Sequence, residues 1–152
     1  LCGDKSQADD AFMAGLLHDI GRLIMATEIP DQMAQAQAQA AQTQTPLYQA
    51  EHQILGVSHA EIGAYLLGLW GLPYPIIEAV ANHHQPQKVP QRGFDVLAAV
   101  YLANLLVQET TTPHPPGSQS IDPVYLESLG VTPTQLAEWR SLALEQTQSP
   151  KE

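Results

Sequence analysis

Residues 12–25 read FMAGLLHDIGRLIM, and this stretch decides the class of fold. Placed on one helix, at about 100° per residue, it is apolar or glycine at nearly every angle. The polar side chains of His18, Asp19 and Arg22 share a single arc with Gly15. The pattern predicts a helix buried almost all round. Its one polar stripe either faces solvent or opens onto a ligand or a metal ion, and both interpretations stay open.

The rest of the chain predicts further helices. Proline and glycine divide it into segments of helical length, and none of them alternates apolar and polar residues as a strand would. We therefore predict an all-α fold. Ser58 and Glu61 form one expected capping box, and Thr132 and Gln135 form another. The further helices are expected over residues 30–45, 46–55, 58–71, 73–84, 94–109, 122–129 and from 132 onward, with loops at 85–93 and 110–121.

Length and charge limit the function classes. The 152 residues suit one domain with a substantial core, which we expect at about residues 9–109, followed by a loop at 110–121 and C-terminal helices at 122–147. One cysteine excludes a disulfide framework. Six basic against 16 acidic residues give a formal net charge of -10, which argues against binding to a nucleic-acid backbone.

The location of the protein follows from its apolar runs. They are shorter than the roughly 20 residues of a membrane span, and no signal peptide opens the chain. We therefore expect a cytoplasmic protein with no membrane partner. Because the chain begins at Leu1 rather than at a methionine, we expect it to be a piece of a longer protein.

Several polar residues occupy apolar helix faces. His59 shares a face with Trp70, which we expect in the core, and His83, His84 and Asn104 are also expected to point inward. Taken singly, each is more often a hydrogen-bonded core residue than a ligand. Together with Asp19, which we expect to be the only carboxylate near the site, they offer a set that suits Zn, Fe, Mn or Ni.

These residues resemble a known family. GLLHDIGRLIM at 15–25 resembles the signature helix of the HD superfamily of metal-dependent phosphohydrolases. Glu51, then LGVSHAEIGAYLLGLWGLP at 55–73 and HHQP at 83–86, are similar to the HDOD branch, often an output module of bacterial response regulators. The resemblance implies an HD-like helical bundle, here without N-terminal helices. It also implies a partner, which is an attached receiver or sensor domain or another signalling protein. A homodimer is left open.

The resemblance also implies a ligand set with departures. In catalytic HD proteins a metal is held by an upstream His, by the doublet that matches His18 and Asp19, and by a later Asp. No His lies in residues 1–17, and Asn104 stands in the helix where the later Asp would fall. Relatives that hydrolyse cyclic diguanylate carry extra His ligands, which His59 and either His83 or His84 resemble. They also carry a Glu after the paired His and a Gly-Tyr-Pro motif, whereas this chain has Gln85 and no such motif.

We therefore expect a signalling module with a degenerate metal site, in line with the loss of catalytic activity generally attributed to HDOD proteins. The alternative is a metal-dependent phosphohydrolase acting on a nucleotide or a cyclic dinucleotide. A third interpretation is a structural domain whose inward His only form hydrogen bonds. We expect a divalent transition metal at low occupancy, with Arg22 and Asn104 available to a phosphate. The expected ligands, which should converge in the fold, are His18, Asp19, His59, His83 and His84.

Overall fold

The computed structural model describes residues 5–90, 93–110 and 117–148, and every regular element in these ranges is a helix. The predicted all-α class is confirmed. None of the helices there is long and apolar enough to cross a membrane. The elements in chain order are α1 (Lys5–Leu17), α2 (Ile20–Glu28), α3 (Pro30–Thr43), α4 (Leu47–Leu55), α5 (His59–Leu69), α6 (Tyr74–Asn82), the 3-10 helix η1 (Pro86–Lys88), α7 (Val96–Thr110), α8 (Pro123–Ser128) and α9 (Pro133–Gln148).

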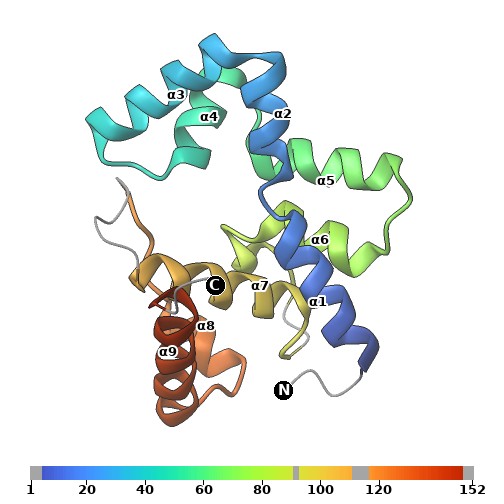
Figure 1. Ribbon diagram of the computed structural model, residues 1–152, viewed down its shortest axis with the longest axis vertical. Coiled ribbons are helices and arrows are strands. Elements are labelled where there is room, and N and C mark those ends of the chain that lie inside the picture. The colour runs from blue at the N-terminus through green and yellow to red at the C-terminus, as the bar shows by residue number, and fades with distance from the viewer. Residues whose placement is uncertain (1–4, 91–92, 111–116, 149–152) are drawn as a thin grey trace.

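Helix α7 is the centre of the fold (Figure 1). It packs against α1 and α6 on one side and against α9 on the other. Helix α5 packs on α6 and on α2, and the hairpin of α3 and α4 continues from α2 at the end of the molecule away from α9. The predicted loop at 110–121 falls partly outside the described residues. The site described below lies where α2, α5 and α6 meet.

Two hydrophobic clusters meet along α7. The first joins α7 to α1, α5 and α6 through residues such as Leu67, Val80 and Val100. The second joins it to α8 and α9, where Trp139 packs against Phe94 with ring centroids 5.6 Å apart. Because α7 contributes to both clusters, it holds the site end and the C-terminal end of the molecule together.

The single helix predicted over residues 12–25 is in fact two. Helix α1 ends at Leu17 and α2 begins at Ile20, so that the chain turns at His18 and Asp19. Near-uniform apolarity does not reveal such a turn, because both halves find apolar partners: α1 on α7 and α2 on α5. The burial expected all round the helix is also wrong, since Phe12 is 72% exposed. The turn removes Asp19 from a helix face and places it at a helix start.

The predicted end of α4 and the predicted start of α5 are confirmed. Gly56 ends α4 with a φ of 73°, and Ser58 and Glu61 form the predicted capping box at the start of α5. This box fixes His59 as the first residue of α5. The prediction that Trp70 lies in the core is wrong. Helix α5 ends at Leu69, and Trp70 is 60% exposed.

Helices α2 and α5 approach each other at Gly21. A Cβ atom added at Gly21 would overlap the backbone carbonyl of His59, and one at Gly63 would lie 3.3 Å from the backbone nitrogen of Gly21. Only glycine allows this contact. By contrast, a Cβ at Gly15 in α1 would meet nothing within 4 Å.

We predict opposite effects on stability for two glycine substitutions. Gly21→Ala should lower the free energy of unfolding by about 3 kcal/mol or more, because backbone must move to relieve the overlap. Gly15→Ala should raise it by about 0.5–1 kcal/mol, because alanine favours an exposed helical position. Urea unfolding followed by circular dichroism measures both. Equal small effects would show that the two helices are not in close contact.

Candidate metal centre

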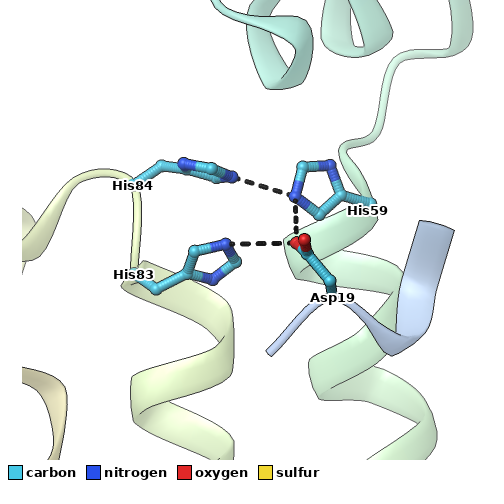
Figure 2. Close-up of side chains that lie close together, drawn as sticks. All are labelled: Asp19, His59, His83 and His84. Carbon is cyan, nitrogen blue, oxygen red and sulfur yellow. Dashed lines mark hydrogen bonds and ion pairs between the residues drawn. The ribbon is translucent and has the colours of Figure 1, made fainter. Parts of the chain in front are cut away.

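Four polar side chains converge between the helices (Figure 2). Asp19 comes from the turn before α2, His59 from the start of α5, and His83 and His84 from the end of α6. Each offers one ligand atom, and these four atoms lie within 4.8 Å of one another. The structure thus brings together four of the five expected ligands. Their role as metal ligands stays a prediction.

Asp19 presents one oxygen to the imidazoles. Its Oδ2 forms an ion pair with Arg22 Nη1 at 2.9 Å, while its Oδ1 lies 3.2 Å from His59 Nε2 and 3.8 Å from His83 Nε2. Burial alone would raise the pKa of Asp19. The contact with His59 and the positive charge of Arg22 outweigh burial and hold the pKa well below its usual range. Asp19 is therefore a carboxylate at neutral pH.

His59 is fully buried and is held from behind by Glu51. Its Nδ1 lies 2.6 Å from Glu51 Oε2, which also accepts a hydrogen bond from the His59 backbone N–H at 2.9 Å. Burial alone would lower the pKa of His59, but the contacts with Asp19 and Glu51 raise it above its ordinary value. Its Nε2 faces Asp19 and His84, so this position favours a positive charge, either a proton or a metal ion.

His83 and His84 are both neutral imidazoles. The Nδ1–H of His83 donates to the Val80 carbonyl at 2.8 Å, which leaves a lone pair on Nε2. Burial lowers the pKa of His83 to about 3, and burial together with the neighbouring His83 and His59 lowers the pKa of His84 to about 2. The His84 ring stacks on Tyr48 with centroids 4.6 Å apart. Neutral imidazole is the form that binds metals.

The donor set fits a divalent transition metal. Asp19 Oδ1 and His83 Nε2 are both buried, no hydrogen bond of good geometry reaches either atom, and they face each other at 3.8 Å. His83 Nε2 is a buried acceptor without a donor, which is costly, and a cation between it and Asp19 Oδ1 would remove that cost. Three imidazole nitrogens and one carboxylate oxygen suit Zn or Fe. Ligands of one such ion are at most about 4 Å apart. The distances from His59 Nε2 to His84 Nε2, at 2.9 Å, and from Asp19 Oδ1 to His83 Nε2, at 3.8 Å, fall within this limit.

His18 lies beside the cluster rather than in it. Its Nδ1 is 2.7 Å from the Gly15 carbonyl, and its Nε2 is 3.6 Å from Asp19 Oδ2, the oxygen that Arg22 holds. Its ring meets that of His83 edge-on, with centroids 5.1 Å apart. In this arrangement His18 contacts the cluster from one side.

The two expected phosphate-binding residues have protein partners. Arg22 is paired with Asp19. Asn104 on α7 is half-buried rather than buried, its Oδ1 accepts a hydrogen bond from Gln108 at 3.1 Å, and it lines with His18 a separate cavity of about 380 Å³. Their predicted role toward a phosphate stays a prediction.

Glu51 is not among the residues expected at the site from the sequence. The expectation that Asp19 is the only carboxylate near the site is wrong, because Glu51 is 0% exposed and contacts His59. A signal was present in the sequence. Glu51 stands four residues from both Leu47 and Leu55, and therefore on the apolar face of α4.

A cavity of about 520 Å³ adjoins the cluster. It lies between α4, the start of α5 and the end of α6, and His84 and Tyr48 line it together with polar residues such as Lys88 and Asn82. His84 therefore belongs to both the cluster and the cavity wall.

Comparisons with known proteins identify the family of the chain. Residues 2–86 match the family model of the HDOD domain, which is more than half of the chain. The chain is also 28% identical over 106 residues to an uncharacterized protein of Treponema pallidum (strain Nichols). That match covers 70% of this chain and 21% of the relative, so the chain spans about a fifth of the relative's length. No solved structure matches the chain significantly. All four residues of the cluster lie within the matched range, and the chain belongs to the HDOD family.

Proposed function

We propose that this chain is a signalling module of the HD type that binds one divalent transition metal ion and does not hydrolyse a substrate. Membership of the HDOD family supports the signalling role. The observation that carries the metal site is the buried His83 Nε2, an acceptor without a donor that faces Asp19 Oδ1 at 3.8 Å. We further propose that the module works in the bacterial cytoplasm, attached to a receiver or sensor domain or bound to another signalling protein.

The number of ligands supports binding without turnover. Asp19, His59, His83 and His84 together supply four ligand atoms. Structural zinc sites have four protein ligands, whereas catalytic sites keep a position open for water or substrate. A hydrolytic metal must hold such a water or polarise a phosphoryl oxygen. For a tetrahedral ion such as zinc, four protein ligands would fill that position.

The carboxylates support a single ion rather than a pair. A two-metal hydrolytic site holds its ions about 3.5–4 Å apart, which calls for bridging ligands. Here Asp19 Oδ2 is paired with Arg22, and Glu51 Oε2 accepts two hydrogen bonds from His59. One oxygen of each carboxylate is thus already engaged, which leaves neither carboxylate with two free oxygens to bridge a pair of ions. When bound, one ion would neutralise buried negative charge and link the starts of α2 and α5 to the end of α6.

The alternative, a metal-dependent phosphohydrolase, has one observation in its favour. The cavity of about 520 Å³ reaches His84, and Lys88 lines it. A phosphate there would meet a cation beside the cluster. This alternative requires His84 or another ligand to leave the ion.

We expect metal content to depend on Asp19. Protein purified without chelator should contain less than one transition metal ion per chain, because a single carboxylate offers modest attraction. Asp19→Ala should remove most of that metal, whereas His52→Ala, which removes an exposed imidazole 3.9 Å from Glu61, should leave it unchanged. Elemental analysis measures all three proteins. Equal metal in the wild type and Asp19→Ala would place the ion elsewhere.

We also expect no appreciable hydrolysis of cyclic dinucleotides or phosphomonoesters with Mn, Fe or Mg added. The reason is that Asp19 is the one carboxylate in the group of ligand atoms and one of its oxygens is paired with Arg22, so no bridging carboxylate is left for a second ion. Product formation is measured by chromatography, with Asp19→Ala as the control for contaminating enzymes. Turnover by the wild type that Asp19→Ala abolishes would reject the non-catalytic proposal and favour the phosphohydrolase.

A further inference from the structure

We propose that Glu51 is a positioning residue that fixes His59 in the Nδ1–H tautomer and thereby aims its Nε2 lone pair at the cluster. The inference rests on the proposed function, since it concerns how the metal site is prepared. Glu51 lies on α4 and does not itself contribute to the group of four ligand atoms. Its effect reaches the metal only through His59.

Glu51 holds His59 through two hydrogen bonds to the same carboxylate oxygen. Oε2 accepts one hydrogen bond from the ring Nδ1–H at 2.6 Å and another from the backbone N–H at 2.9 Å. The first sets the rotation and the tautomer of the ring, because a carboxylate can only accept. The second ties the same oxygen to the first residue of α5. Together they leave the Nε2 of His59 facing Asp19 and His84.

Capping of α5 explains only one of the two hydrogen bonds that Glu51 accepts, the one from the His59 backbone N–H. Ser58 and Glu61 already form a complete capping box at this helix start. Glu51 is 0% exposed, and its second oxygen, Oε1, is buried with no hydrogen-bond partner. Such an oxygen costs free energy. Filling space in the core would not need a charged side chain. We therefore attribute the presence of Glu51 to its negative charge beside His59.

Charge at this position strengthens a metal ligand. A carboxylate behind a ligating imidazole orients the ring and raises the basicity of the other nitrogen, and its loss typically costs 10–100-fold in metal affinity. The other imidazoles have weaker support. A neutral carbonyl, that of Val80, holds the ring of His83, and the ring of His84 stacks on Tyr48. His59 is therefore the ligand that Glu51 strengthens most.

The decisive variant is Glu51→Gln, which keeps the shape and removes the charge. Its amide can also turn an N–H₂ toward Nδ1, which favours the Nε2–H tautomer and puts a proton where the ion would bind. The matched control is Glu28→Gln, which removes one charge at the exposed last residue of α2. Titration with Co²⁺, followed by its absorption spectrum, should show a loss of affinity of about 10–100-fold for Glu51→Gln and little change for the control.

A second measurement is independent of metal. Nitrogen-15 NMR of labelled histidine, in the metal-free protein at alkaline pH, reports which ring nitrogen carries the proton. The wild type and Glu28→Gln should show His59 as Nδ1–H, and Glu51→Gln should show Nε2–H or a mixture. A merely structural role for Glu51 would not move this tautomer. If Glu51→Gln does not fold, Glu51→Asp replaces it. The shorter side chain keeps the charge but moves it away from His59 Nδ1, so the loss of Co²⁺ affinity and the change of tautomer should both be smaller.

The outcomes separate the inference from the proposed function. An unchanged tautomer or an unchanged Co²⁺ affinity in the Glu51 variant overturns the inference, even if the wild type binds metal well. Failure of the wild type to bind Co²⁺ overturns the proposed function. The tautomer of His59 then decides by itself whether Glu51 positions the ring.

Discussion

The close approach of α2 and α5 at Gly21 is the constraint on which the site depends. The backbone of Gly21 lies against the carbonyl of His59, and Asp19 stands only two residues before it. This contact brings Asp19 Oδ1 to 3.2 Å from His59 Nε2. Helix α6, which packs on α5, then adds the paired His at its end. A cluster drawn from three separate helix ends thus follows from one backbone contact that only glycine permits.

Sequence reasoning succeeds where the signals are local. Gly56, the capping box of Ser58 and Glu61, and the apolar face that turns His59 inward are each decided within a few residues. Sequence reasoning fails where contacts between distant parts of the chain determine the structure. The turn at Asp19 has apolar residues on both sides, so hydrophobicity does not mark it. The partner of Glu51 lies eight residues later, across the turn at Gly56, and only the fold shows that they meet.

Helix α4 links the α3–α4 hairpin to the cluster at two points. Glu51 holds the ring of His59, and Tyr48, one helical turn earlier on the same face, stacks on His84. Movement of α4 would disturb both contacts at once, and two of the four ligand atoms with them. The hairpin thus contacts the cluster through two side chains, although none of the four ligand atoms comes from it. The cavity beside α4 shares the same two side chains, Tyr48 and His84.

Charge balance explains why one position in the cluster favours a cation. Asp19 and Glu51 bring two negative charges into a largely buried region, and Arg22 balances one of them. The remaining negative charge is costly where water is excluded. A proton on His59 can offset it, and the raised pKa of His59 has this cause. A metal ion held between Asp19 Oδ1 and the imidazole nitrogens offsets the same charge and also satisfies His83 Nε2, which a proton on His59 leaves without a partner. In the metal-bound state that we propose, the ion would therefore make a contact with His83 Nε2 that a proton on His59 does not make.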